Sequence, residues 1–484
     1  MVTTKSHKAP LREAVLSPDR LMRLENFGHS ISSPAYLHRP SRVDQIYDLF
    51  EAARACGYKI GLRGAARSYG DAAMNSGGIV LDLRRLNRIL DWDPDTGVIQ
   101  VEPGVTIQQI WQFTLEDGWW PPVVPGTMHP TIGGCLAMNI HGKNNYAAGP
   151  IGEHVLAFTA ILPSGEQILC TPDTESELFY AMIGGLGMLG VITSVTLQLK
   201  RVYSGELWVK AWAVPDLNSM LDDIDQRKEE ADYLVGWIDS TAGGKSLGRG
   251  QLHQADYLAP GEDSQPAVTL SLDHQTLPDN IMGVVPKSLT WRIMRPFMNT
   301  MGLKAVNTAR YLSSWTLHHE TRVRQSFAAF NFLLDYVPNW ERAYGSGGLI
   351  QFQMFVPAGR AGETFQETLK LTKKNGEPTY LGVLKRHRPD KFLLSHAVDG
   401  FSMAMDFRIT KRNHRKIQRQ SETLARMALE AGGRFYFAKD STLHPDMVEQ
   451  FLGTETINRF RELKARCDPE SLLETDLYRR CFRE

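Results

Sequence analysis

The sequence predicts an α+β protein made of two or three packed units. Its 484 residues are too many for one ordinary hydrophobic core. Between residues 30 and 202, predicted strands and helices are interleaved without the regular spacing of a doubly wound parallel sheet. After Lys200, aromatic strands such as Glu206–Val214 alternate with amphipathic helices such as Leu217–Glu229. That change indicates a second domain, built on an antiparallel sheet with flanking helices.

The predicted domain organisation follows from these changes of pattern. Residues 1–30 show little periodicity and are interpreted as a leader, residues 31–202 as the first domain and residues 203–430 as the second. Residues 240–310 are rich in Gly, Ser and polar side chains, which predicts long loops or a mobile lid. Residues 431–484 are predicted to be a C-terminal segment that returns to the first domain.

In the first domain, Ser41 is predicted to cap a helix that carries Val43, Ile46, Leu49, Phe50 and Ala53 on one face and ends at Gly57. Further elements follow in order: strands at Tyr58–Arg63, Ile79–Leu83 and Val98–Glu102, a helix at Thr106–Glu116, and a hairpin of Ala157–Leu162 and Gln167–Thr171.

The segment from Leu178 to Leu199 carries no charge and is about as long as a membrane span. Gly184, Gly185, Gly187 and Gly190 interrupt it, so a helix over 175–183, a glycine turn and a strand over 191–199 are predicted instead. Later in the chain the predicted elements are a strand at Leu349–Pro357, helices at Gly362–Lys374 and Lys411–Ala431, and a strand at Arg434–Lys439.

Composition excludes several classes of function. Hydrophobic residues make up 42% and charged residues 22%, as in soluble globular proteins, and 54 basic residues balance 54 acidic ones, so no nucleic-acid partner is indicated. The five cysteines are widely spaced without a CxxC pair, which predicts neither a disulfide framework nor a metal site. No signal peptide is recognised in residues 1–24. We therefore expect a cytoplasmic protein, with peripheral membrane contact as an alternative role for the basic run 408–419, which is more simply a solvated helix face.

Two glycine-rich runs are predicted to form two halves of one cofactor site. The first cradle is Arg63–Asp71, with the sequence RGAARSYGD directly after a predicted strand, and the second cradle extends from Pro125 to Asn144. Small residues allow backbone N–H groups to approach an anionic phosphate closely. Two such surfaces would suit a cofactor with a diphosphate and a long body.

Other motifs have both structural and functional interpretations. The GxGxxG match at 185–190 follows a helix and opens a strand, which is the reverse of a dinucleotide-binding Rossmann turn. His141 is a candidate because Lys143 and Asn144 lie beside it. Lys439 ends an apolar run and is either a salt-bridged strand end or a site residue. Trp119, Trp120 and Trp340 are interpreted as packing residues.

Together these runs resemble the flavoproteins of the vanillyl-alcohol-oxidase and p-cresol-methylhydroxylase (PCMH) type. The resemblance covers about residues 35–484 and departs in 203–310, where it is patchy. Its most specific runs are HGKN at 141–144 and AKDS at 438–441. The other matching runs are 63–71, 125–127, 131–134, 184–192, 340–345, 351–353, 383–385, 468–469 and 476–480.

The resemblance implies an FAD-binding domain of the PCMH type with two subdomains, joined to a substrate domain. Relatives often bind FAD covalently through a His where this chain has Arg67, so non-covalent FAD is expected. The expected cofactor-binding residues are Arg63, Gly64, Ala65, Ala66, Arg67, Ser68, Tyr69, Gly70, Gly126, Thr127, Thr131, Ile132, Gly133, Gly134, Met138, Asn139, Ile140, His141, Lys143, Asn144, Ile192 and Tyr436.

The resemblance also implies an oxidoreductase that acts on CH–OH groups. The expected catalytic residues are Lys439, Lys385 and His141, and the expected substrate contacts are Tyr69, Gln353, Lys385, Ala404 and Lys439. Some relatives have Cys where Ala404 stands, so thiol chemistry is not expected there.

The implied reaction oxidises a secondary alcohol of a sugar: the 2-hydroxyl of a polyprenylphosphoryl pentose becomes a 2-keto group. This would be the first half of an epimerisation in cell-wall biosynthesis, completed by a short-chain reductase as partner. One alternative is a soluble aldonolactone or alditol oxidase that uses oxygen. The other is a non-catalytic binding protein with the flavin fold.

Overall fold

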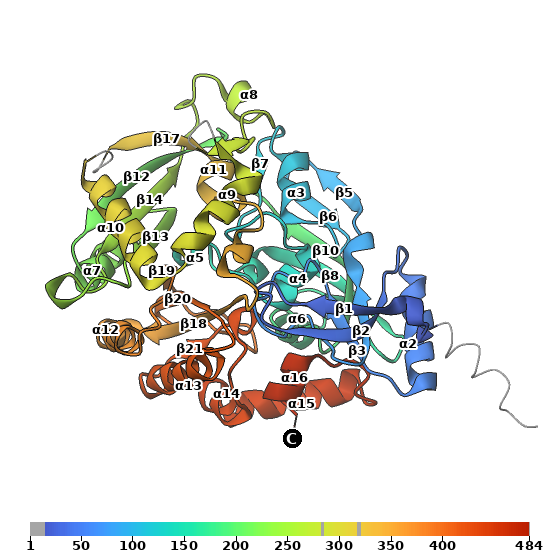
Figure 1. Ribbon diagram of the computed structural model, residues 1–484. Coiled ribbons are helices and arrows are strands. Elements are labelled where there is room, and N and C mark those ends of the chain that lie inside the picture. Colours follow the sequence, from blue (N-terminus) through green and yellow to red (C-terminus); the bar gives the residue numbers. More distant parts are fainter. Residues whose placement is uncertain (1–14, 282–284, 317–320, 484) are drawn as a thin grey trace, which may run out of the picture.

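The computed structural model describes residues 15–281, 285–316 and 321–483 (Figure 1). Three sheets organise these residues, with strand orders β1-β2-β4-β3, β5-β6-β10-β8-β9 and β17-β12-β14-β13-β19-β20-β18-β21. The first two sheets come from the first 200 residues, and the third contains only strands that follow residue 205. Helices and largely antiparallel sheets together confirm the α+β class.

The first sheet consists of β1 (Leu21–Glu25), β2 (Ser32–His38), β3 (Ile60–Arg63) and β4 (Ile79–Asp82). Strand β1 pairs antiparallel with β2 along its whole length. The expectation of a leader over residues 1–30 is therefore wrong from β1 onward, because these residues gain ladder hydrogen bonds, and residues 1–14 lie outside the described part. The short 3₁₀ helix η1 (Pro18–Arg20) precedes β1.

Helix α2 (Asp44–Cys56) begins later than predicted. Val43 is its N-cap, and the backbone N–H of Ser41 donates to the Gln45 side chain at 2.8 Å, so Ser41 does not cap the helix. Its end is as predicted, since Gly57 adopts a left-handed conformation with φ of 72°.

The second sheet is formed by β5 (Ile89–Asp93), β6 (Val98–Val101), β8 (Val155–Ile161), β9 (Gln167–Cys170) and β10 (Val191–Gln198). Helix α6 (Ser176–Met182), a glycine turn and β10 account for the uncharged segment, as predicted. Within the described residues, we find no helix of the length and apolarity needed to cross a membrane. The remaining elements here are η2 (Leu83–Arg85), α3 (Ile107–Thr114), β7 (Trp119–Trp120), α4 (Ile132–Ala137), α5 (Asn145–Ala148), η3 (Ile151–His154) and β11 (Lys200–Arg201).

The eight-stranded sheet is the largest element of the second half of the chain. Its strands are β12 (Glu206–Val214), β13 (Tyr233–Ile238), β14 (Gly250–Tyr257), β17 (Arg322–Ser326), β18 (Leu349–Pro357), β19 (Gly382–His387), β20 (Gly400–Arg408) and β21 (Arg434–Phe435). Helices α7 (Leu217–Arg227), α12 (Ala358–Lys374) and α13 (His414–Glu430) pack side by side on one face. The other face of the sheet lines the cavity that is described in the next subsection.

The expected loops over 240–310 are largely regular structure instead. Strand β14, helix α9 (Lys287–Met294), the 3₁₀ turn η5 (Arg295–Phe297) and helix α10 (Thr300–Thr316) occupy this segment. Their periodicity is weak for a physical reason: α10 exposes apolar side chains such as Met301 and Val306 as well as burying Leu303, so its two faces contrast little. Shorter elements nearby are η4 (Gly244–Ser246), α8 (Pro266–Thr269), β15 (Asn280–Ile281), β16 (Val285–Pro286), α11 (Phe327–Asn331), η6 (Leu333–Tyr336) and η7 (Trp340–Tyr344).

The C-terminal segment joins the two halves of the molecule. The strand predicted at 434–439 ends at Phe435 and gives way to the 3₁₀ turn η8 (Phe437–Lys439). Three helices follow: α14 (Pro445–Leu452), α15 (Thr454–Cys467) and α16 (Asp476–Cys481). Helix α14 packs against α13 and α15, and α15 and α16 lie below the first sheet in Figure 1. Arg480 on α16 binds the Asp71 carboxylate at 2.8 Å, and Glu474 N–H donates to the Ile60 carbonyl at 2.9 Å. The C-terminal segment therefore supports the first cradle and the strand that precedes it.

Gly70 marks the closest approach between the first cradle and the C-terminal segment. A Cβ at this position would lie 1.6 Å from the carbonyl oxygen of Asp440. We expect Gly70→Ala to destabilise the protein by about 1–3 kcal/mol, because the two backbones must separate. Urea denaturation would measure the change. Gly359→Ala is the control, since no atom lies within 4 Å of its added Cβ; equal stability of the two variants would contradict the expectation.

Candidate active site

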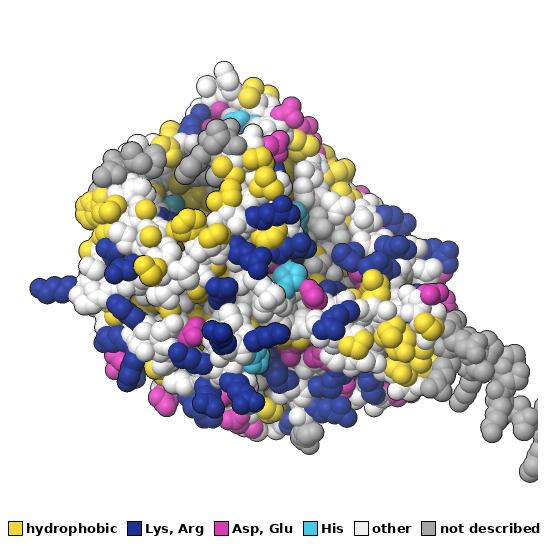
Figure 2. Space-filling model, viewed as in Figure 1, with side chains coloured by type: hydrophobic (Ala, Val, Ile, Leu, Met, Phe, Trp, Pro, Cys, Tyr) yellow, Lys and Arg dark blue, Asp and Glu magenta, His cyan; other side chains and the backbone are white. Residues whose placement is uncertain are grey.

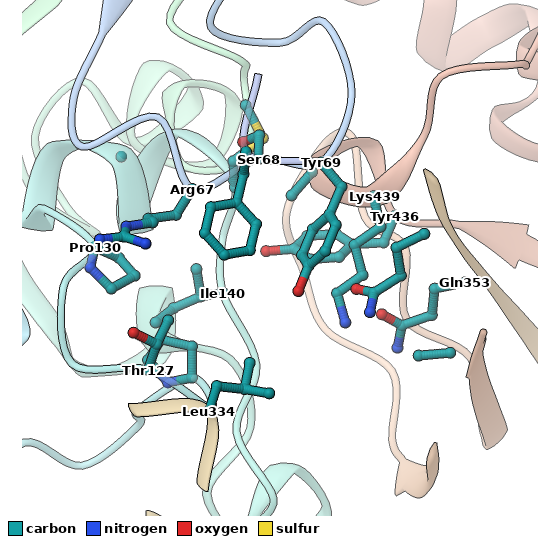
Figure 3. Close-up of a pocket in the computed structure, with 18 of the residues that line it drawn as sticks. Arg67, Ser68, Tyr69, Thr127, Pro130, Ile140, Leu334, Gln353, Tyr436 and Lys439 are labelled. Atoms are coloured by element: carbon teal, nitrogen blue, oxygen red, sulfur yellow. The ribbon is translucent and has the colours of Figure 1, made fainter. Parts of the chain in front are cut away.

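A cavity of about 710 Å³ lies between the first domain and the open face of the eight-stranded sheet. Both cradles line it, and so do residues of β13, β14, β18, β19 and β20. Figure 3 shows Arg67, Thr127 and Leu334 on one side of this space and Gln353, Tyr436 and Lys439 on the other, with Tyr69 between them. The cavity therefore brings together segments from both halves of the chain.

The first cradle leaves β3 and turns sharply across the cavity wall. Ala66 adopts a left-handed conformation with φ of 52°, and a Cβ on Gly64 would lie 2.2 Å from the Thr131 hydroxyl oxygen. Within the described chain, the backbone N–H groups of residues 65–68 donate to no other residue. The buried Nε of Arg67 also has no partner there. Unpartnered donors around a small-residue turn suit the diphosphate of a dinucleotide.

The second cradle lines the part of the cavity that lies nearer to the eight-stranded sheet. Thr131 precedes α4, and a Cβ on Gly133 would lie 2.8 Å from Pro103 Cβ, so the loop and the preceding turn are in close contact. The Thr127 hydroxyl donates to the Asp335 carboxylate at 2.6 Å, which ties this loop to η6 in the second half of the chain. The residues present therefore fit FAD, and the two cradles would hold it.

Alternation along the strands determines which side chains reach the cavity from the sheet. Gln353 on β18 lies opposite Ala404 on β20, and Ala404 lies opposite Val383 on β19. Lys385, two residues beyond Val383, lies opposite Ser402. Because side chains alternate between the two faces, all of these residues point away from α12 and α13 and into the cavity.

His141 connects the second cradle to the sheet through hydrogen bonds. Gln353 Nε2 lies 3.3 Å from His141 Nε2 and donates to Ser402 Oγ at 2.9 Å. Lys385 Nζ lies 3.4 Å from His141 Nδ1. A neutral imidazole carries a single N–H, so one ring nitrogen of His141 can accept a hydrogen bond while the other donates one.

Burial lowers the pKa of every lysine that lines the cavity. The pKa of Lys143 is lowered to about 7 by desolvation, although it donates to the Asn331 carbonyl at 3.1 Å. Desolvation and the charges of Lys439 and Lys143 hold the pKa of Lys385 well below 10.5. The pKa of Lys439 is lowered to about 8, since desolvation outweighs the attraction of Asp406. Lys143 and Lys439 therefore change charge close to neutral pH.

The carboxylate near these cations is Asp406. Gln351 Nε2 donates to it, and so does the Tyr344 hydroxyl, at 3.3 Å. Desolvation raises its pKa to about 6 despite these bonds and the charge of Lys439. His141 is neutral, because desolvation and then the charge of Lys385 hold its pKa well below 6.5.

Most of the residues predicted from the sequence line this cavity. Gly70, Ile132, Asn139 and Asn144 do not. Gly70 is pressed against Asp440, Ile132 is fully buried in the core, Asn139 accepts a hydrogen bond from Gly152 N–H at 3.0 Å, and Asn144 donates to the Pro122 carbonyl at 2.7 Å. These four residues support the loops rather than face the cavity.

Several lining residues were missed by sequence reasoning. They include the turn 185–190, Trp237, His253, Arg310, Gln351 and Ser402. The turn and Gln351 belong to runs that carry the family resemblance, but neither was assigned a role in the site. The other sheet residues gave no signal, because strand pairing, not spacing in the chain, brings them together. Trp340, predicted to be a packing residue, lines the cavity and also packs against Phe27 and Tyr344.

Comparisons with known proteins agree with this geometry. Residues 34–171 match the family described as FAD binding domain. The chain is 29% identical to decaprenylphosphoryl-beta-D-ribose oxidase of Mycolicibacterium smegmatis, over 96% of this chain and 98% of that protein. It is 29% identical to an uncharacterized FAD-linked oxidoreductase of Mycobacterium tuberculosis, over 34% of this chain and 38% of the relative.

A further relative is D-arabinono-1,4-lactone oxidase of Yarrowia lipolytica, which is 27% identical over 36% of this chain and 33% of its own length. The matched FAD binding domain contains both cradles, and one relative that is similar over nearly the whole chain is an oxidase. The protein is therefore an FAD-dependent oxidoreductase, and residues 34–171 contain its FAD binding domain.

Proposed function

We propose that the protein oxidises a secondary alcohol of a sugar carried on a polyprenyl phosphate, converting the 2-hydroxyl of a pentose to a 2-keto group. The main support is the character of the cavity beyond the FAD cradles. It is lined by Lys143, Lys385, Lys439 and Arg310, and among the described lining residues there is no Asp or Glu. A cationic cavity of this kind suits a sugar that carries a phosphate.

The chemistry needs a base for the hydroxyl proton and an acceptor for the hydride. FAD, when bound, supplies the hydride acceptor. Lys385 is suited to accept the proton, because desolvation and the charges of Lys439 and Lys143 hold its pKa well below 10.5. Lys439, with a pKa of about 8, remains a cation at neutral pH and can orient the substrate hydroxyl and stabilise developing negative charge.

Arg310 is suited to bind the phosphate. It lies on α10, lines the cavity, and its guanidinium carbon is 4.2 Å from the centre of the Trp237 ring. Desolvation lowers its pKa to about 10, which still leaves it charged at neutral pH. The neighbouring lining residue His253 is kept neutral, since desolvation and then the charge of Arg310 lower its pKa to about 3. A phosphodiester would relieve the desolvation of this buried cation.

The polyprenyl chain would leave the cavity through an apolar opening. Phe297, Val306 and Leu333 line the cavity and are also about half exposed, at 52%, 53% and 51%. Such an opening suits a lipid tail better than a free sugar. Completion of an epimerisation would need a separate reductase, and a short-chain reductase is the partner that we propose.

The second candidate function is oxidation of a free aldonolactone or alditol with oxygen as acceptor. It is favoured by the similarity to D-arabinono-1,4-lactone oxidase, although that similarity covers only a third of either chain. The two functions differ in whether the substrate carries a phosphate and a lipid, so substrate preference separates them.

We expect FAD to be bound without a covalent bond, because Arg67 occupies the first cradle where relatives carry a linking His. Precipitation of the purified protein with acid should release all of the flavin into the supernatant. The measurement is flavin absorbance in the supernatant and in the washed pellet. A pellet that stays yellow after washing would contradict the expectation.

Lys439→Ala should bind FAD but lose bleaching of the flavin by substrate. Loss of a cation next to the reacting atoms is expected to slow reduction at least about 100-fold. Anaerobic stopped-flow absorbance measures the rate, and the flavin content of the variant checks that the cavity is intact. Bleaching at the wild-type rate would refute the assignment.

Lys439→Arg serves as the matched control. In the wild type, the reduction rate should fall as pH rises through about 8, because Lys439 then loses its charge. An arginine stays charged in that range, so the variant should retain part of the activity and show no fall there.

Arg310→Gln should raise KM about tenfold or more for a polyprenylphosphoryl pentose, and leave KM for a free sugar or aldonolactone unchanged. Arg227→Gln is the control, because Arg227 also lies over a tryptophan ring, 4.7 Å from the centre of the Trp212 ring, but does not line the cavity. An equal effect of Arg310→Gln on both substrates would argue against a phosphate contact. Faster turnover of the free aldonolactone by the wild type would favour the second candidate function.

A further inference from the structure

We propose that the surface formed by α9, η5 and α10 docks onto an anionic lipid bilayer and turns the mouth of the cavity towards the membrane. We call this surface the docking face and define its apolar part as Leu289, Ile293, Phe297, Met301 and Val306. The docking face consists of surface residues, so its contact with a bilayer does not depend on the identity of the substrate.

The docking face is unusually apolar for a surface exposed to water. Met301 is 84% exposed, and the other four side chains are between 42% and 53% exposed. In Figure 2, hydrophobic side chains lie over α10 and α9, with Lys and Arg side chains among them and a hollow between the two helices. Exposed apolar patches on this scale usually mark an interaction site.

Helix α10 shows that this exposure is not a by-product of core packing. Its inner face carries Leu303 and Asn307, which are buried and one turn apart. Its outer face would normally be polar, yet it presents Met301, Ala305 and Ala309 to solvent. A helix with one side in the protein and an apolar opposite side is suited to a second apolar environment.

The charges of this segment favour an anionic bilayer over an apolar protein partner. Residues 280–316 contain no Asp or Glu. Arg292, Arg295 and Lys304 are exposed among the apolar side chains, and Lys287 pairs with Asp279 at 2.9 Å. Apolar side chains mixed with Lys and Arg, without acidic residues, are the pattern of helices that lie in the membrane interface.

The docking face also borders the cavity. Phe297 and Val306 are exposed on the surface and line the cavity as well, so they belong to both. A bilayer in contact with the docking face would therefore lie at the cavity mouth. If the proposed lipid-linked substrate is correct, it could pass from the bilayer into the cavity without crossing water.

The basic run 408–419, considered from the sequence as a possible lipid contact, lies elsewhere. Helix α13 packs against β18, whereas α10 packs against β12 and β14 towards the other end of the eight-stranded sheet. None of the large apolar side chains that are exposed lies on α13. This run provides charge without an apolar face, which makes it a suitable control.

The test is cosedimentation of the FAD-loaded protein with vesicles, without substrate. We expect it to sediment with vesicles of equal parts phosphatidylglycerol and phosphatidylcholine, but not with phosphatidylcholine alone, and less at high salt. Equal binding to both vesicles, or binding to neither, would overturn the proposal. Because no substrate is present, the outcome is independent of the oxidation tests.

Two sets of variants locate the contact. The triple variant Leu289→Ser, Ile293→Ser and Met301→Ser, none of which lines the cavity, should reduce vesicle partitioning at least about tenfold. The triple variant Arg292→Gln, Arg295→Gln and Lys304→Gln should reduce it on the order of a hundredfold at low salt.

Matched controls remove equivalent groups elsewhere. Leu156→Ser with Leu169→Ser removes exposed leucines of the second sheet, and Arg412→Gln with Arg415→Gln and Arg419→Gln removes charges at α13. Both should bind vesicles as the wild type does. Wild-type binding by the docking-face variants, or equal losses in the controls, would overturn the proposal. Flavin content and reduction of the flavin by a soluble substrate check that each variant is folded.

Discussion

The burial of several cations around one cavity is the constraint on which the rest of the structure depends. Lys143, Lys385 and Lys439 lose their hydration, and Asp406 alone among their described neighbours is placed to offset them. Burying an unpaired charge costs free energy, and this cost favours the neutral amines and lowers their pKa values. The same imbalance makes the cavity receptive to an anionic ligand and provides a neutral amine beside a cationic one.

Such a cavity cannot be built by either half of the chain alone. The first domain contributes loops with few bulky side chains, and the eight-stranded sheet contributes one wall through the alternate residues of its strands. Asp335 ties the second cradle to the sheet side, and Arg480 ties the first cradle to the C-terminal segment. Lys439 lies on η8, directly after the short strand β21, and so it is positioned by both the sheet and the C-terminal segment.

The surface at the cavity mouth differs from the rest of the exterior in how its exposed apolar side chains are distributed. Most exposed apolar side chains of a protein are scattered, but here they gather on α9, η5 and α10 where acidic residues are lacking. The cavity is cationic, and the docking face at its mouth is both apolar and cationic. Both features suit a reaction at the boundary between water and lipid.

The sequence by itself determined the α+β class, the second-domain strands β12 and β18, the helix–turn–strand at 175–199 and both cradles, because these depend on local periodicity and on glycine. The roles of Lys385 and Lys439 came from resemblance, not from any local pattern. Tertiary structure alone decided that Gln353, Ser402 and His141 meet, that Arg310 enters the cavity, and that Asn139 and Asn144 face away from it. These residues become neighbours through strand register and through the packing of segments that are far apart in the chain. Such contacts produce no periodic pattern in the sequence.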